Sequence, residues 1–139
     1  MIYSAEARIV VPVRDTEVTD RVEDAVRNIF PNVEFEREAG RIVGETHSLE
    51  QFSEKLHEQA ILDTARREFT KRADEDGFSF ALKKQAAFKG VVNFAVGNPD
   101  ELGDIEVHVT VDSPGVEAFV DHVAPPTEDG KPVQPDERE

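Results

Sequence analysis

The sequence predicts an α+β domain in which helices pack on one face of a mainly antiparallel sheet. Segments such as 2–13 and 104–112 alternate apolar and polar residues, as half-buried strands do. Other segments repeat apolar residues at helical spacing, and neighbouring strands are joined by connections of hairpin length. The expected order of elements is β-α-β-β-α-α-β-β-β-α, which favours two packed layers.

The first elements in this order are a strand and a helix. Residues 2–13 form the strand. A helix follows, capped by Asp15 or Thr16 and with Glu17 in its first turn. Pro31 ends this helix, because proline cannot continue the hydrogen-bonded pattern.

A hairpin comes next. Two short strands at 33–37 and 41–46 are joined by a turn that contains Gly40. Gly44 falls inside the second strand, where a glycine weakens the strand or marks a bulge.

Two helical segments then precede a turn. Residues 48–51, Ser-Leu-Glu-Gln, fit the capping box of the first helix. The second helix runs from residue 61 to about residue 74 after a short break. Asp76-Gly77 is a turn that follows it.

The stretch after this turn predicts two further strands. Residues 78–82 alternate apolar and small or polar side chains. Lys84 continues the inward positions of this strand, so it either reaches outward along its aliphatic stem or marks the rim of the sheet. Residues 85–90 are expected to form a turn, 91–96 a strand and 97–100 a loop.

The last strand and helix close a domain that is expected to span residues 1–124. Residues 104–112 form the most regular strand of the chain. Ser113 is the predicted cap of a short helix, with Pro114 in its first position. Residues 125–139 are acidic and proline-rich, with few apolar side chains, and are predicted to be a disordered tail.

The composition bounds the class of protein. The chain has 139 residues and a formal net charge of −14, which is typical of adaptation to a high-salt, halophilic cytoplasm or of cationic partners. It contains no cysteine, which excludes disulfides and thiolate metal sites. Apolar runs stay short of the ~18 residues of a membrane span and no signal peptide is recognised, so a cytoplasmic protein is expected.

The sequence offers little for metal binding or catalysis. The four histidines are scattered and show no HxxH or HExxH spacing, and the glycines are isolated rather than grouped in a phosphate-binding loop. No serine elbow of the GxSxG type is present. We therefore expect neither an enzyme nor a bound cofactor or metal.

One stretch stands out by its charge. Residues 61–89 contain seven basic and five acidic residues, in a chain with 16 basic and 30 acidic residues in total. A local basic footprint indicates an anionic partner, and nucleic acid is the obvious candidate. The basic residues of this stretch are Arg66, Arg67, Lys71, Arg72, Lys83, Lys84 and Lys89.

An ordinary solvated surface explains part of this footprint equally well. Asp63 precedes Arg67 by four residues and Glu68 precedes Arg72 by four, which is the favourable order for pairing along a helix. If these pairs form, Arg66 and Lys71 are the basic residues of the helix that are more available to a partner. Lys83, Lys84 and Lys89 have no acidic residue within their own segment of the sequence. Charge alone leaves a binding surface and a solvated face both open.

Three segments resemble the signature of a known family. They are Ile61-Leu62-Asp63-Thr64-Ala65-Arg66, Lys84-Gln85-Ala86-Ala87-Phe88 and Leu102-Gly103-Asp104-Ile105-Glu106-Val107. In this order they are similar to an archaeal family described as predicted RNA-binding or exosome-associated proteins, over roughly residues 2–124. The family usually has Asn where Lys83 stands here. The resemblance implies a fold similar to that of large-subunit ribosomal protein five, and RNA with exosome- or ribosome-related proteins as partners.

The leading hypothesis is therefore a non-catalytic RNA-binding protein, accessory to an RNA-processing assembly of the exosome type. The predicted contacts to RNA are Arg66, Lys71, Lys83, Lys84, Gln85 and Lys89. Basic side chains would contact phosphates and Gln85 a ribose or base edge. Phe88 is interpreted as core, with stacking on an unpaired base as the alternative. The rival hypothesis is a protein-interaction or homodimeric module whose sheet edge or face pairs with a partner.

Overall fold

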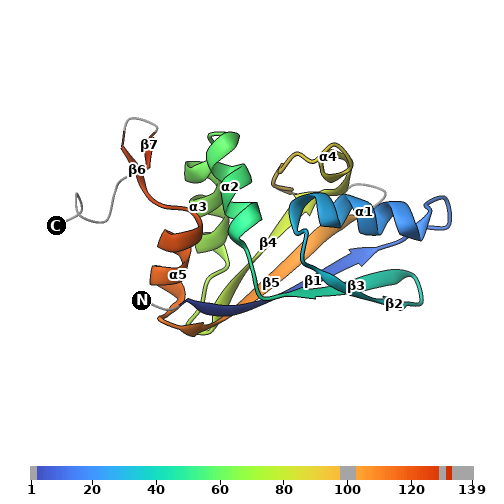
Figure 1. The fold of residues 1–139 in the computed structure, drawn as a ribbon, viewed down its shortest axis with the longest axis horizontal. Helices are drawn as coiled ribbons and strands as arrows, with labels where there is room; N and C mark the ends of the chain where they lie inside the picture. Colours follow the sequence, from blue (N-terminus) through green and yellow to red (C-terminus); the bar gives the residue numbers. More distant parts are fainter. Residues whose placement is uncertain (1–2, 98–102, 129–130, 133–139) are drawn as a thin grey trace.

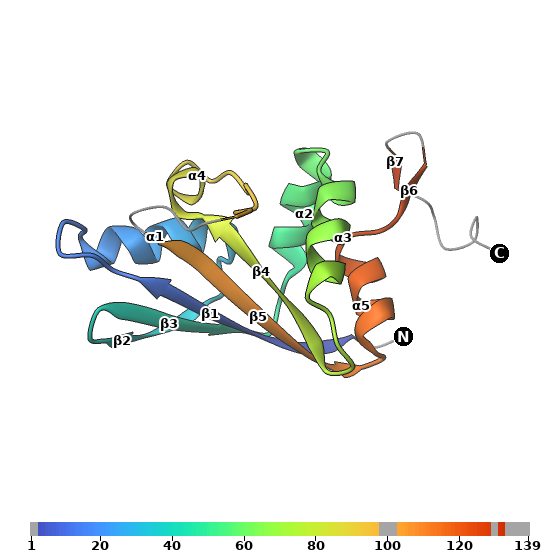
Figure 2. The same ribbon diagram turned by 180° about the vertical axis from the view of Figure 1, so that it is seen from behind.

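A five-stranded antiparallel sheet with helices on one face forms the domain, which confirms the predicted α+β class. The computed structural model describes residues 3–97, 103–128 and 131–132. The strands lie in the order β2-β3-β1-β5-β4, and every neighbouring pair is antiparallel. Figures 1 and 2 show that the helices cover one face and leave the other open. The strands are β1 Ser4–Pro12, β2 Glu34–Glu38, β3 Arg41–Thr46, β4 Gly77–Lys83 and β5 Asp104–Ser113.

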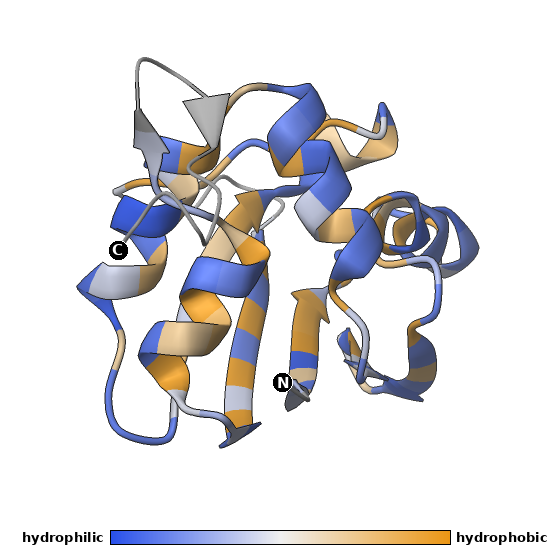
Figure 3. Ribbon diagram, turned by 60° about the vertical axis from the view of Figure 1, so that its left-hand side comes forward, coloured by the Kyte–Doolittle hydropathy of each residue, from blue (hydrophilic) through white to orange (hydrophobic). Residues whose placement is uncertain are grey.

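The core lies between the sheet and the helices. The alternation seen in the sequence sends every second side chain of β1 and β5 inward, where Ile9, Val11, Ile105 and Val107 are fully buried. Figure 3 shows the same alternation as hydrophobic and hydrophilic bands along the strands. Phenylalanines from different elements meet over β4, and the ring of Phe52 stacks on that of Phe80 with centroids 5.3 Å apart.

The helices divide into two groups above the sheet. Helices α1 Thr19–Ile29 and α4 Lys84–Phe88 lie side by side over one end. Helices α2 Glu50–Glu58, α3 Leu62–Lys71 and α5 Val116–Val123 lie over the other end. Within the described ranges none of these helices combines the length and the apolar character that crossing a membrane requires.

Helix α1 begins later than the sequence predicts, and its expected first turn has another role. The helix starts at Thr19, with Val18 as its cap, so neither Asp15 nor Thr16 caps it. Glu17 lies in the turn before the helix and accepts a hydrogen bond from the backbone of Arg14. Its carboxylate also faces the ammonium of Lys84, which draws this turn toward α4 instead of into the helix.

The buried Lys84 joins three segments of the chain. Its side chain is 1% exposed, and Nζ donates to the carbonyl oxygen of Pro12 at 2.6 Å and to Glu17 Oε1 at 3.0 Å. The Glu17 side chain is 8% exposed. The lysine therefore points inward without reaching solvent, because it has both a charged partner and a carbonyl acceptor inside.

The segment after β4 differs from the predicted turn and strand. Residues 84–88 form the short helix α4, and residues 91–96 make a single bridge, between Phe94 and Leu82. The Gln59 side chain at the end of α2 binds the backbone of this segment. Its amide donates to the carbonyl oxygen of Val92 at 2.8 Å, and its oxygen accepts from the Val92 N–H at 2.9 Å. The backbone groups of Asn93 and Ala95 bond to β4 instead, from Lys83 N–H to Asn93 O and from Ala95 N–H to Ala81 O, so the segment lies between α2 and β4.

The structure differs from the predictions for Gly44 and for Pro114. Gly44 keeps a regular register opposite Ile9 and Phe35, so β3 has no bulge there. A Cβ at this position would lie 2.6 Å from Val33 Cγ2, so the glycine makes room for side chains of the hairpin. Helix α5 begins at Val116 with Gly115 as its cap, so Pro114 precedes the helix instead of opening it.

The beginning of the predicted tail has secondary structure. Two-residue strands, β6 Thr127–Glu128 and β7 Lys131–Pro132, pair with each other. The Thr127 hydroxyl donates to Asp63 at the start of α3. Residues 133–139, and 98–102 with most of the predicted loop at 97–100, lie outside the described residues. The division into a domain at 1–124 and a tail stays a prediction.

We predict that Lys84→Met lowers the free energy of unfolding by about 3–5 kcal/mol, because it leaves the Glu17 carboxylate in a buried site without its cation. Urea denaturation followed by circular dichroism measures the change. Lys89→Met, one turn away on the exposed side of α4, is the control, with an expected change below about 0.5 kcal/mol. Equal losses in both variants would contradict the role of the buried pair.

If Lys84→Met does not fold, the double variant Glu17→Gln with Lys84→Met supplies the test. Removing both charges takes away the uncompensated carboxylate, so the double variant is expected to be more stable than Lys84→Met. A double variant as unstable as the single one would show that the loss comes from packing and not from the charge pair.

Candidate nucleic-acid interface

The six predicted RNA contacts fall on two separate parts of the molecule. Arg66 and Lys71 lie on α3, whereas the other four extend from the end of β4 to the C-cap of α4. Figure 1 shows α3 grouped with α2 and α5, and α4 beside α1. The tertiary structure therefore does not bring all six side chains into one patch.

Arg66 links α3 to α5. Its guanidinium donates to Asp121 Oδ1 at 2.6 Å and to the carbonyl oxygen of Ala124 at 2.8 Å. The Arg66 and Asp121 side chains are 28% and 27% exposed. Because Ala124 lies just after the last residue of α5, the arginine also satisfies a carbonyl at the end of that helix. Arg66 thus holds two helices together.

The remaining charges on α3 pair differently from the prediction. Lys71 Nζ lies 2.8 Å from Glu68 Oε2, so this acid pairs with Lys71 and not with Arg72. Asp63 accepts from Thr127 and not from Arg67. Lys71 remains 49% exposed despite its partner. The surface of α3 is a solvated face with local ion pairs.

Of the four predicted contacts around α4, Lys84 is withdrawn from solvent. Its burial and its bonds to Pro12 and Glu17 leave no path for a phosphate to reach the ammonium. The residue serves the fold, and we assign it no contact to RNA. Lys83, in contrast, is exposed at the end of β4, where it is the cap of α4.

The outward side of α4 carries three different functional groups. Gln85, Phe88 and Lys89 are exposed, while Lys84 and Ala87 point inward. Positions three and four residues apart lie on the same side of a helix, so these three side chains form one short stripe. We call Lys83, Gln85, Phe88 and Lys89 together the α4 surface. It combines a hydrogen-bonding amide and an aromatic ring with two cations.

Phe88 is 41% exposed, which corrects its interpretation as a core residue. The adjacent Val92 and Phe94 are buried and fill the core in its place. The spacing of Gln85, Phe88 and Lys89, followed by Gly90, was the available signal. Good helix formers ended by a glycine predict a short helix, and the inward positions would then be Lys84 and Ala87.

Several contacts hold the α4 surface in place. Gly90 has a φ of 73° and ends the helix with two bonds, from its own N–H to Ala87 O and from Val91 N–H to Ala86 O. This is the Schellman arrangement, which glycine adopts without steric cost. The Asn28 amide of α1 also donates to Ala87 O at 3.0 Å.

Lys55, a basic residue outside the predicted set, completes this anchoring. Its Nζ donates to the carbonyl oxygen of Gly90 at 2.8 Å, which connects α2 to the end of α4. The bond places a third cation at the end of α4, where Lys89 is the cap. No signal in the local sequence indicates it, because α2 and the end of α4 are distant along the chain.

The edges of the sheet bear on the rival hypothesis of a homodimer. Along β2 the exposed Glu34, Glu36 and Glu38 would face like charges if a second copy paired there. At the other edge, β4 already bonds residues 93–95, from Lys83 N–H to Asn93 O and from Ala95 N–H to Ala81 O. Both edges therefore disfavour simple strand pairing between copies.

The described part of the chain contains no candidate metal site. No group of three or more histidines and carboxylates within these residues is arranged to hold an ion. The strongest shift of a titrating group belongs to Arg37, where hydrogen bonds to Glu23 and Asp20 raise the pKa of the guanidinium. Such a contact holds β2 against α1 and offers no acid or base for catalysis.

The sequence and the fold of this chain are both similar to those of archaeal proteins. A family model described as RNA binding matches residues 6–112. A UPF0201 protein of Methanocaldococcus jannaschii is 36% identical over 140 residues, covering 96% of this chain and 81% of its own length. The crystal structure of a UPF0201 protein from Methanococcus jannaschii superposes with a TM-score of 0.85 at 34% identity, covering 93% of this chain and 99% of that one.

One relative is considerably longer. A UPF0200/UPF0201 protein of Archaeoglobus fulgidus is 38% identical over 132 residues, which is 94% of this chain. The match spans 41% of the length of that relative. The remainder of the longer protein has no counterpart in the 139 residues of this chain.

We predict that Arg66→Ala lowers the free energy of unfolding by about 1–3 kcal/mol, because it leaves Asp121 and the Ala124 carbonyl without their donor. Thermal unfolding measures the effect. Arg67→Ala, exposed on the same helix, is the matched control, with a change below about 0.5 kcal/mol. If the two variants unfold alike, Arg66 does not connect α3 to α5.

Proposed function

Since this chain belongs to the archaeal UPF0201 family and to the family described as RNA binding, we propose that it binds RNA through the α4 surface. The proposal keeps Lys83, Gln85 and Lys89 from the predicted contacts and adds Phe88. It gives Lys71 at most a peripheral contact, because this lysine lies on α3 and pairs with Glu68.

The single observation that carries the proposal is the exposed ring of Phe88 between Gln85 and Lys89 on an anchored helix. A solvent-exposed aromatic side chain costs hydrophobic free energy unless a partner covers it. Unpaired RNA bases stack on aromatic rings, and each such contact contributes about 1–3 kcal/mol. Because Asn28 and Gly90 fix the backbone of α4, little conformational entropy is lost when a base stacks.

The other side chains of the α4 surface supply complementary contacts. Lys83 and Lys89 bind phosphates on either side of a stacked base, which positions the strand without reading its sequence. Gln85 carries both a donor and an acceptor, so it can hydrogen-bond a base edge or a ribose hydroxyl. Ring, amide and cation together favour unpaired RNA over a regular duplex, whose bases are already stacked.

The strong acidity of the chain sets the conditions for binding. A net charge of −14 repels RNA at long range in dilute salt. At 1 M salt the Debye length falls to about 3 Å, so this repulsion nearly vanishes while stacking persists. We therefore infer that binding depends on salt much less than in basic RNA-binding proteins.

We extend the proposal to a non-catalytic role in a larger RNA-processing assembly. The described residues offer no grouped histidines and carboxylates for metal-assisted chemistry. The α4 surface is small, with room for a few nucleotides, so a partner protein would have to supply further affinity. An exosome-type assembly is the partner that the resemblance of the sequence implies.

We predict that Phe88→Ala weakens binding of single-stranded RNA by about tenfold, because it removes one stacking contact. Fluorescence anisotropy with a short labelled oligonucleotide, at several salt concentrations, measures the dissociation constant. The loss is expected to persist at high salt. Phe88→Tyr keeps an aromatic ring and is expected to bind as the native protein does.

Charge reversals separate the α4 surface from general electrostatics. Lys89→Glu is expected to weaken binding severalfold in low salt, and Lys71→Glu, with the same charge change on α3, to have little effect. Equal losses would exclude the α4 surface as the specific site. Absence of binding to single-stranded and structured RNA at every salt concentration would refute the proposed function, and a stable dimer in light scattering would then favour the rival.

A further inference from the structure

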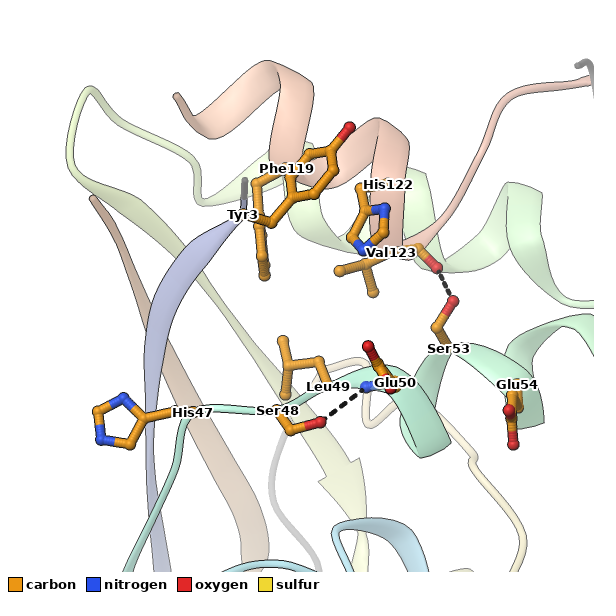
Figure 4. Close-up of a pocket in the computed structure, with 10 residues that line it drawn as sticks. All are labelled: Tyr3, His47, Ser48, Leu49, Glu50, Ser53, Glu54, Phe119, His122 and Val123. Atoms are coloured by element: carbon orange, nitrogen blue, oxygen red, sulfur yellow. Dashed lines mark hydrogen bonds between the residues drawn. The ribbon is translucent and has the colours of Figure 1, made fainter. Parts of the chain in front are cut away.

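A second concave surface lies at the end of the sheet away from α4. It is a pocket of about 410 Å³ between the start of β1, the connection from β3 to α2, and α5. Figure 4 shows the rings of Tyr3, Phe119 and His122 on one side of it, and Leu49, Ser48 and Glu50 on the other. The volume falls in the range of small-ligand sites, about 300–1,000 Å³.

One wall of the pocket is aromatic and aliphatic. The Tyr3 and His122 rings stack with centroids 3.8 Å apart and planes at 8°. The Phe119 ring lies 6.3 Å from each of them. Val123 on this wall and Leu49 on the opposite one are almost fully buried. This wall suits the alkyl part of a ligand and, through its rings, a cation.

The charge of the lining is negative. Glu50 and Glu54 stand one turn apart on α2, and the residues that line the pocket include no lysine or arginine. Neither glutamate has an ion-pair partner among the described residues. Figure 4 places Glu50 at the pocket between Leu49 and Ser53, and Glu54 at its margin. An anionic ligand such as a phosphate would be repelled here.

One hydrogen bond joins the two walls of the pocket, and another fixes the start of α2. The Ser53 hydroxyl donates to the carbonyl oxygen of Val123 at 2.6 Å, which ties α2 to α5. At the start of α2 the Ser48 hydroxyl accepts from the Glu50 N–H at 3.5 Å. The pocket is therefore formed before a ligand enters, which reduces the entropy lost on binding.

We propose that this pocket binds an alkylammonium or alkylguanidinium group. The alkyl chain packs against Leu49, Phe119 and Val123, and the cation pairs with the Glu50 carboxylate, across the pocket from the aromatic rings. A free small amine and the lysine or arginine side chain of a partner protein share this chemistry. The site is independent of the α4 surface, so its success or failure leaves the proposed RNA contacts unchanged.

The test is a titration of the ¹⁵N-labelled protein with agmatine, followed by amide chemical shifts. Shifts are expected to concentrate at Tyr3, residues 48–54 and residues 119–123. Glu50→Gln is expected to weaken binding about tenfold, the effect of losing one charge-assisted hydrogen bond. Glu58→Gln, an exposed glutamate at the other end of α2, is the matched control and is expected to bind normally.

Four results would overturn the proposal. Shifts spread over the acidic surface, or equal losses in Glu50→Gln and Glu58→Gln, would show unspecific attraction of a cation. Equal binding of uncharged 1-butanol would show that the pocket is only apolar. Absence of any shift would show that no such site exists.

A competing peptide then identifies the source of the cation. If a short uncharged peptide with one internal lysine displaces agmatine, the pocket supports a partner protein as its occupant. If the peptide does not displace agmatine while agmatine binds, the pocket supports a free amine as its occupant.

Discussion

The buried pair of Lys84 and Glu17 is the contact on which the rest of the α4 region depends. The lysine joins the end of β1, through the Pro12 carbonyl, to the turn before α1 and to the first residue of α4. Because Lys84 points inward, Ala87 does so as well, and Gln85, Phe88 and Lys89 must then face solvent. One buried cation therefore determines which side chains the helix presents.

The positive charges of this acidic chain divide into structural and available ones. Lys84 and Arg66 are held by carboxylates and carbonyls from distant parts of the sequence, and Lys55 donates to a backbone oxygen. Such bonds offset the cost of removing a charge from water. Lys83 and Lys89 remain exposed beside an exposed ring. Counting basic residues in the sequence thus overestimates the surface that can bind an anionic partner. Their positions in the structure limit that surface to the region of Lys83 and Lys89.

The two proposed sites lie at opposite ends of the helical layer and have opposite chemistry. The α4 surface offers cations and an aromatic ring to a polyanion, and the pocket beside α5 offers carboxylates and rings to a cation. This separation suits a small adaptor, since one end can contact RNA while the other engages a basic side chain. It also keeps the acidic pocket away from the phosphates that it would repel.

Apolar periodicity was enough to predict the α+β class, the five strands of the main sheet and the four longer helices, because burial on one face imposes a local pattern. It also predicted a strand at 91–96, where the structure has a single bridge. Helix α1 begins a few residues later than predicted, because Glu17, expected in its first turn, pairs with the distant Lys84 instead. The structural roles of Lys84 and Arg66, and the bonds of Gln59 to the backbone of Val92, emerged only from the three-dimensional arrangement. Each depends on residues about 30 or more positions away, and such pairings leave no trace in local patterns.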